Sequence, residues 1–444
     1  MYMRRISSLL VSLAFLAAAS TGLASSQETH GNEGNQGARH GQLVDATLVA
    51  SYSEEQVAAL VKSAFTWPGQ DISELVSTAT AVDAFAITFR TEAPQGRPIT
   101  ASGLVAVPSP ADGVYPVVQY HHGTQFDNFD VPSSLGRSQE GMATMALFAG
   151  HGYVASMPDY IGQGGLAVHF SDSRAEAPEP SRHEKSGPSH PYLHAGSMAI
   201  SAADMLKAVS ELSYRLRVRT SSRLFICGLS EGGHATMALQ RHIERNATAQ
   251  PFRLTASGPM AGPYDVRACW RSLSESGPPG GSPLALQIYL SYAKIYRFDE
   301  PLREVFNPPW PGVVGRIDDG RHNGNEMYWM LPKTLQGLMD PDFLAAVAAG
   351  KNPVAEAMDR NLTSDFPAVT PTRLYHAEGD ELVPFGASVT ARDRMKALGA
   401  VDVQVVDVGA GVGHVESFVP SMLMAKKWFD TFNKPATSPA GNLN

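Results

Sequence analysis

Residues 223–239 read RLFICGLSEGGHATMAL, and this stretch decides the fold class. An apolar run leads into a Gly-x-Ser-x-Gly turn with Ser230 at its centre, and small residues then lead into a helix-forming segment. A Ser hydroxyl is a poor nucleophile unless the backbone holds it clear of the sheet beside a base. Glycines such as Gly228 and Gly232 let so strained a turn close without side-chain clashes. The stretch therefore predicts a buried strand, a nucleophile turn and a helix, in that order.

A nucleophilic serine needs a base and an acid, and candidates for both stand later in the chain. Asp380 follows a segment with the pattern of a strand at 372–377, and His414 follows another at 401–408. Each therefore lies just past the carboxyl end of a predicted strand, where an open parallel sheet meets its ligands. The spacing of 34 from Asp380 to His414 (414 − 380) leaves room for one helix and one strand, as parallel pairing requires.

The chemistry gives each of these side chains a role. We expect His414 to take the Ser230 proton during attack on a carbonyl carbon and to return it to the leaving group. Asp380 would hold the imidazole in the right tautomer and stabilise the imidazolium. Glu381 is a rival for the acid and Glu378 a weaker one, because a run of acids after a strand is also typical of a solvated turn.

A candidate oxyanion hole comes earlier in the chain. Residues 115–120 have the pattern of a central strand and run into the tetrapeptide HHGT at 121–124. A His-Gly turn after such a strand directs backbone N–H groups at a developing oxyanion, together with the N–H of the residue after the nucleophile. We expect these donors to be the amides of Thr124 and Glu231. The paired histidines suggest a metal, but no third ligand stands at a recognisable spacing, and we predict no metal site.

The order of these motifs resembles the α/β-hydrolase superfamily. Three softer motifs, MPDYIGQG at 157–164, HPYLH at 190–194 and GLSEGGH at 228–234, resemble the secretory-lipase branch that includes Candida lipase A. The resemblance covers residues 80–432. It implies an α/β-hydrolase fold, with a mostly parallel central sheet flanked by helices and a large inserted cap or lid, and the activity of a secreted ester hydrolase. The two histidines at 121–122 depart from the lipase, which has a different loop there.

The start of the chain has the pattern of an export signal followed by a tether. Residues 1–25 combine a charged start, a short apolar run and small residues, which is typical of a secretory signal peptide. Residues 26–42 carry almost no large apolar side chains and cannot form a core. We therefore expect a secreted or periplasmic protein. No later segment approaches the ~20 apolar residues of a spanning helix, so we expect no integral membrane association.

Element patterns divide the rest of the chain. Residues 43–80 carry helical periodicity, which predicts a helix from residue 43 that ends near Pro68 and Gly69, and alternation predicts strands at 85–91 and 100–107. Helical stretches are also expected at 284–296 and 342–349, between two predicted strands. The predicted domains are a hydrolase core at 43–261 and 371–432, a cap insertion at 262–370, and a flexible tail at 433–444.

The cap segment suggests where the substrate would bind. It contains clusters of aromatic residues and prolines, among them Trp310 and Trp329. Any one of these aromatics is readily explained as part of the cap's own core, but so much apolar surface favours an apolar acyl or alkyl pocket. With His122, Gly123 and Tyr160 beside the motifs, these two tryptophans are the candidate pocket residues.

Composition limits the partners. The formal net charge of −8 argues against nucleic acid, which needs a basic surface. Two cysteines are no disulfide framework. Export leaves a Cys227–Cys269 bridge open, although Cys227 lies in the strand before the nucleophile turn, where a small thiol packs well. No cofactor is expected, and a monomer is favoured.

The sequence thus favours a serine carboxylic ester hydrolase that acts on small or lipid-like esters with hydrophobic acyl groups. A serine peptidase and an acyltransferase remain as alternatives, since the same scaffold supports both. A non-catalytic binding protein is less favoured, because the serine, acid and histidine are all present in the order the chemistry needs.

Overall fold

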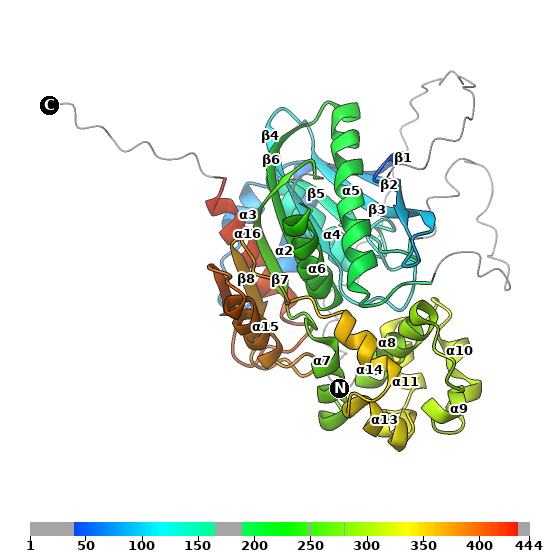
Figure 1. Cartoon of the computed structure of the whole chain (residues 1–444). Helices are drawn as coiled ribbons and strands as arrows, with labels where there is room; N and C mark the ends of the chain where they lie inside the picture. Colours follow the sequence, from blue (N-terminus) through cyan, green and yellow to red (C-terminus); the bar gives the residue numbers. More distant parts are fainter. Residues whose placement is uncertain (1–39, 165–188, 247–249, 279, 434–444) are drawn as a thin grey trace, which may run out of the picture. The chain divides into compact units, whose positions relative to one another are not determined.

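The computed structural model describes residues 40–164, 189–246, 250–278 and 280–433 (Figure 1). The predicted signal peptide, nearly all of the predicted tether and the tail from residue 434 onward lie outside these ranges. Within them, no helix combines the length and apolar character needed to cross a membrane.

A nine-stranded sheet forms the core, in the order β1-β2-β3-β5-β4-β6-β7-β8-β9. Neighbours from β5 to β9 pair in parallel, whereas β1, β2, β3 and β5 pair antiparallel. The sheet is therefore mostly parallel, as predicted. Its strands are β1 (Leu43–Tyr52), β2 (Val82–Glu92), β3 (Pro98–Pro108), β4 (Val114–His121), β5 (Val154–Pro158), β6 (Arg219–Leu229), β7 (Arg253–Met260), β8 (Thr372–His376) and β9 (Val403–Asp407).

The prediction for residues 43–80 is correct only in part. Leu43–Tyr52 is not helical but forms β1, an edge strand antiparallel to β2. The helices in this segment are α2 (Glu54–Phe65) and α3 (Ser73–Ser77). Ser53 starts α2 with a capping box, a local signal that marks the true boundary between strand and helix. Pairing with β2 decides the conformation of β1, and that partner is distant in sequence.

Helices cover both faces of the sheet, and β6 shows how one strand serves both. Phe225 and Cys227 join the apolar cluster that includes α2, α4 (Gln139–Phe148) and α16 (Phe418–Thr431). Leu224 and Ile226 join the cluster that includes α5 (Ala195–Leu216) and the end of α6 (Glu231–Arg245). Successive side chains of a strand point to opposite faces, so the continuous apolar run predicts a strand buried on both sides. The helix α15 (Gly386–Ala397) packs on β8, β9 and α6.

Between β7 and β8 the described residues form helices and one isolated antiparallel bridge, Phe306 to Met339, and the helices gather in one cluster in Figure 1. Tyr289, Phe306 and Phe343 are buried there, and the rings of Tyr289 and Phe306 meet edge to face with centroids 5.2 Å apart. These aromatics form the segment's own core. The helices are α7 (Val266–Ser276), α8 (Gly281–Tyr296), α9 (Leu302–Val305), η3 (Trp310–Gly312), α10 (Val314–Ile317), α11 (Gly324–Met330), α12 (Leu335–Leu338), α13 (Pro341–Ala348) and α14 (Pro353–Arg360). The predicted helices at 284–296 and 342–349 are confirmed as α8 and α13.

The two ends of this helical segment lie side by side. The backbone N–H of Thr363, after α14, donates to the carbonyl oxygen of Tyr264, before α7, at 3.0 Å. The Thr363 hydroxyl donates to the same oxygen at 3.3 Å. The segment therefore leaves the core and returns to it at one point.

Candidate active site

Ser230 lies in the tight turn between β6 and α6. Its backbone has φ 60° and ψ −118°, a conformation that residues other than glycine rarely adopt. Two hydrogen bonds hold the turn: Ser230 N–H donates to the Met260 carbonyl at 2.8 Å, and His234 N–H donates to the Ser230 carbonyl at 3.1 Å. Hydrogen bonds to β7 and within α6 therefore stabilise the strained backbone of Ser230.

The glycines of the motif are required by close backbone contacts. A Cβ atom on Gly232 would lie 1.9 Å from the carbonyl oxygen of His121, and one on Gly228 would lie 2.5 Å from the same oxygen. On Gly233 it would lie 2.5 Å from the Met260 carbonyl oxygen. The turn is thus packed between the carboxyl ends of β4 and β7, and no larger residue fits at these positions.

The structure brings Ser230, His414 and Asp380 together. His414 Nε2 lies 2.9 Å from Ser230 Oγ, and His414 Nδ1 lies 2.6 Å from Asp380 Oδ2. The imidazole and the carboxyl group are both buried, and the serine is partly exposed. A hydroxyl, an imidazole and a carboxylate are linked in series in this way, and such a series can move a proton away from the hydroxyl.

The rival acid makes a different contact. Glu381 Oε2 accepts from the backbone N–H of His414 at 3.0 Å, so this carboxylate bonds the main chain and not the imidazole. Asp380 Oδ1 accepts from two backbone N–H groups, those of Leu382 at 2.9 Å and Val383 at 2.8 Å. These bonds aim the other oxygen of Asp380 at His414.

His376 is a further contact of Asp380 that the sequence did not assign. Its Nε2 lies 3.2 Å from Asp380 Oδ2, and its Nδ1 lies 2.7 Å from Ser388 Oγ. The histidine ends β8, four residues before Asp380, and both side chains are fully buried. The pattern that could have indicated it is a histidine at the end of a strand beside the acidic turn, but which way it points is decided by packing.

The electrostatics of the pair favour a carboxylate beside the histidine. Burial acts to raise the pKa of Asp380, but the charge of His414 and hydrogen bonds from His376 and His414 outweigh it and lower this pKa well below its usual range. Burial likewise acts to lower the pKa of His414. The carboxylate of Asp380, with Glu381 and Glu416 nearby, outweighs it, so the pKa of His414 is raised above 6.5.

The two predicted oxyanion donors make no hydrogen bond within the described part of the chain. The Gly123 N–H donates to Glu140 Oε2 at 2.9 Å, and the Tyr120 hydroxyl donates to the same oxygen at 2.6 Å. By contrast, the backbone N–H groups of Thr124 and Glu231 have no hydrogen-bond acceptor among the described residues. Glu140 thus fixes the loop and takes up the Gly123 amide, while the next amide stays available for a ligand.

His122 and Tyr160 brace this loop from behind. The His122 ring lies between two carbonyl oxygens, that of Gly123 at 2.7 Å from Nδ1 and that of Asp159 at 3.3 Å from Nε2. The Tyr160 hydroxyl donates to the His122 carbonyl at 2.9 Å, and the two ring centroids are 4.2 Å apart. Both side chains are buried, so they line the protein interior beside the loop.

The two tryptophans of the predicted pocket differ in their surroundings. Trp329 is 74% exposed and has the Lys333 ammonium group 4.4 Å above its ring. Trp310 packs partly buried against the apolar cluster of the helical segment. The sequence shows that these residues are aromatic, but it does not show which side of a helix faces the site.

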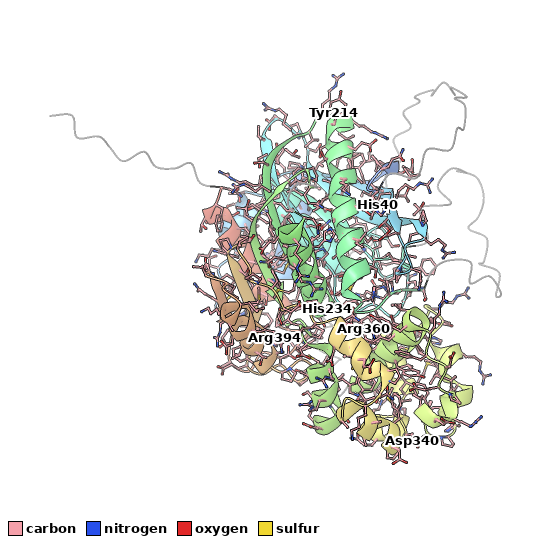
Figure 2. The ribbon with its side chains drawn as sticks, in the orientation of Figure 1. His40, Tyr214, His234, Asp340, Arg360 and Arg394 are labelled. Carbon is pink, nitrogen blue, oxygen red and sulfur yellow. The ribbon has the colours of Figure 1, made fainter. Side chains whose placement is uncertain are left out.

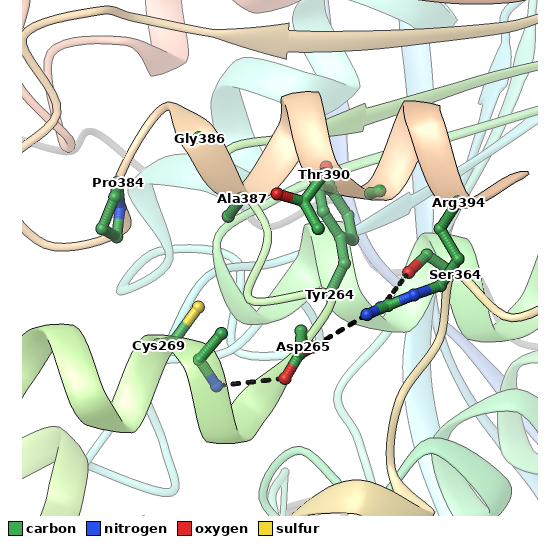
Figure 3. Close-up of a pocket in the computed structure, with 11 residues that line it drawn as sticks. Tyr264, Asp265, Cys269, Ser364, Pro384, Gly386, Ala387, Thr390 and Arg394 are labelled. Atoms are coloured by element: carbon green, nitrogen blue, oxygen red, sulfur yellow. Dashed lines mark hydrogen bonds and ion pairs between the residues drawn. The ribbon is translucent and has the colours of Figure 1, made fainter.

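A cavity of about 190 Å³ lies between α7 and α15 (Figure 3). Arg394 lines the cavity, and its guanidinium group lies 3.3 Å from Asp265 Oδ2 and 3.2 Å from Ser364 Oγ. Cys269 and Tyr264 also line it. Neither Ser230 nor any of the predicted pocket residues lines this cavity, so it is separate from the serine.

Other histidines near the motifs are internal. His234, labelled in Figure 2, lies on α6 with Nδ1 3.0 Å from the Pro263 carbonyl, and burial lowers its pKa to about 4. Burial likewise lowers the pKa of His121 to about 3, and its Nδ1 lies 2.9 Å from Thr236 Oγ1. In the described part of the chain, no three His, Cys, Asp or Glu side chains are grouped as metal ligands. Cys227 and Cys269 are both buried and unpaired.

Comparisons with known proteins agree with this architecture. No family model and no curated protein matches the sequence. Among solved structures, a candidate hydrolase from Legionella pneumophila matches at 24% sequence identity. The match covers 89% of this chain and 99% of that chain, with a TM-score of 0.76. The rice cell wall degrading esterase LipA from Xanthomonas oryzae matches with 25% identity, 88% and 96% coverage and a TM-score of 0.72. Candida antarctica lipase A matches with 14% identity, 89% and 83% coverage and a TM-score of 0.58. The chain therefore has the α/β-hydrolase fold.

Proposed function

We propose that the protein is a secreted serine hydrolase of carboxylic esters with hydrophobic acyl groups. The observation that carries the proposal is the continuous series from Ser230 Oγ through the His414 ring to Asp380, with separations of 2.9 and 2.6 Å. The chain's likeness to an esterase and a lipase supports ester bonds as the class of substrate. The composition of residues 1–25 supports export.

In the first half-reaction, the Ser230 oxygen attacks the ester carbonyl carbon while His414 Nε2 accepts the hydroxyl proton. The amides of Thr124 and Glu231 donate to the oxygen that becomes negative. Asp380 stays ionised, since its pKa is depressed, and stabilises the imidazolium. When the tetrahedral intermediate collapses, the C–O bond to the alcohol breaks and His414 gives its proton to the leaving oxygen. The acyl group remains on Ser230.

In the second half-reaction, water replaces the alcohol. His414, neutral again, accepts a proton from the water as its oxygen attacks the acyl carbon. Collapse of the second tetrahedral intermediate breaks the bond to Ser230, whose oxygen recovers its proton from His414. The products are a carboxylic acid and the free enzyme, and no cofactor takes part in either step.

The proposal is tested by turnover of p-nitrophenyl esters from two to sixteen carbons, measured beside a panel of peptide anilides. We expect ester turnover by the wild-type protein and none above background for Ser230→Ala, with the same melting temperature. Turnover by the alanine variant would place the chemistry elsewhere. Faster cleavage of anilides than of esters would identify a peptidase instead.

A serine-directed fluorophosphonate gives an independent test. We expect it to label Ser230 in the wild-type protein and to label nothing in Ser230→Ala, as measured by mass spectrometry of the peptide. Absence of labelling in the wild type would favour a binding protein without catalytic chemistry.

A further inference from the structure

Glu231 follows the proposed nucleophile and buries its carboxylate. The side chain is fully buried, and Oε1 lies 2.6 Å from Nε2 of His190. Its other oxygen, Oε2, is buried without a hydrogen-bond partner in the described part of the molecule. A buried carboxylate with one unsatisfied oxygen depends strongly on the partner that it does have. That partner is His190, which is itself 8% exposed.

His190 is held in a fixed orientation. Its Nδ1 lies 3.3 Å from the Ile161 carbonyl oxygen, and its ring stacks on Tyr160 with centroids 5.5 Å apart and planes 14° apart. The Glu231 carboxylate is an acceptor only, so Nε2–H donates to it. The 2.6 Å separation is typical of a charge-assisted hydrogen bond.

Two residues further on, Tyr192 contacts the other proposed oxyanion donor. Its hydroxyl lies 2.8 Å from Thr124 Oγ1. The same turn is fastened to α8, because the Tyr292 hydroxyl donates to the Leu193 carbonyl at 3.0 Å and Ser291 Oγ donates to the Tyr192 carbonyl at 3.4 Å. One short segment therefore contacts Glu231 on one side, Thr124 on the other and the helical segment behind.

We propose that His190 and Tyr192 are positioning residues for the oxyanion hole, acting through the side chains of Glu231 and Thr124. The inference rests on the proposed function, since it concerns the amides that would stabilise the negative oxygen in that reaction. The inference gives a role to residues 190–193, which are hydrogen-bonded to α8.

His190 acts in two ways. By holding the Glu231 side chain, it fixes the residue whose backbone N–H would donate to the oxyanion in the proposed reaction. By donating to the carboxylate, it also compensates a negative charge that would otherwise oppose a second negative charge on the neighbouring oxyanion. Tyr192 acts only in the first way, by fixing Thr124.

The charge role predicts a rescue. His190→Leu keeps bulk but removes the donor, and we expect kcat to fall about tenfold or more, within the ~10²–10³-fold that loss of a whole oxyanion donor causes. KM should change little. Adding Glu231→Gln to His190→Leu removes the uncompensated charge, so the double variant should recover most of the lost kcat. A packing role for His190 predicts no such recovery.

Affinity for a trifluoromethyl ketone with the same acyl chain gives the second measurement, because this inhibitor forms a tetrahedral oxyanion on the serine. Across the variants its inhibition constant should rise by the factor by which kcat/KM falls. Tyr192→Phe, which removes only the hydroxyl, should show the same proportionality with a smaller loss. This conservative variant keeps the test available should His190→Leu not fold.

His322→Leu is the matched control, because His322 lies 2.9 Å from Asp319 in a similar pair within the helical segment. It should leave kcat and inhibitor affinity unchanged. Wild-type kcat in both His190→Leu and Tyr192→Phe, or a double variant no better than His190→Leu, would overturn the inference alone. A wild-type protein that hydrolyses no ester would overturn the proposed function and the inference together.

Discussion

At Ser230 the backbone is strained and the hydroxyl meets one imidazole. The positive φ turns the hydroxyl out of the sheet, and His414 Nε2 meets it at 2.9 Å. Asp380 in turn meets the far side of the ring. Each of these contacts leads to a measurable expectation.

Asp380→Asn should lower kcat for an ester by up to ~10⁴-fold, by analogy with other serine triads, because the amide favours the wrong imidazole tautomer. Steady-state kinetics on a p-nitrophenyl ester measures the effect. Glu381→Gln is the neighbouring control and should cost far less, since Glu381 bonds only the His414 backbone. The reverse ranking would transfer the role of the acid to Glu381.

The pH dependence follows from the raised pKa of His414. The proposed base must be neutral, so kcat/KM should fall as the pH drops through that pKa, with its acid limb above pH 6.5. Glu416 is one of the charges that raise the pKa. Glu416→Gln should therefore move the acid limb to lower pH, and Glu416→Asp, which keeps the charge, should move it less. A limb shifted to higher pH in Glu416→Gln would contradict this electrostatic account.

Whether a site residue can be predicted from the sequence depends on whether the residues that define it are contiguous in the chain. Ser230 stands in a motif whose glycines, strand and helix are contiguous, so its place in the fold could be predicted. His190 stands in the HPYLH motif, but nothing local indicates its partner: Glu231 is 41 positions away, and only the fold brings the two together. Trp329 was predicted from its residue type alone, and its outward direction is set by the packing of α11.

At the junction of β6 and α6, the backbone packing leaves no room for a side chain. Gly232→Ala would place a methyl group 1.9 Å from the His121 carbonyl oxygen, so the ends of β4 and β6 would have to separate. We expect a loss of stability of about 1–3 kcal/mol or more, together with loss of turnover, measured by chemical denaturation and ester assay. Gly136→Ala, where no atom lies within 4 Å of the new methyl group, should leave both unchanged. A fully stable and active Gly232→Ala would show that the elbow adjusts.

Elements buried on both faces were the most predictable, and the edge was the least. The apolar run in β6 has no alternative to a central strand, because both of its faces are covered by helices. β1 has mixed exposure and one neighbour, so its sequence carries a weaker pattern, and residues 43–52 were expected to be helical. The Ser53 capping box marks where the helix begins.

For the molecule as a whole, the two cysteines provide a test of the packing. Both thiols are buried, and burial raises the pKa of each above its ordinary value. A thiolate-directed reagent should therefore modify neither in the native protein and both after unfolding in guanidinium without reductant. Quantitative thiol titration gives the count. No reactive thiol after unfolding would reveal a Cys227–Cys269 bridge.

The bonds between Thr363 and Tyr264 have a consequence for replacement of the helical segment. Because the helical segment departs and rejoins at one spot, exchanging it for a longer, shorter or unrelated piece would leave the strand ladder undisturbed, and closing a loop of different length changes the free energy only slowly. The fold therefore tolerates replacement of the whole helical segment at this point without a change in the order or register of the strands.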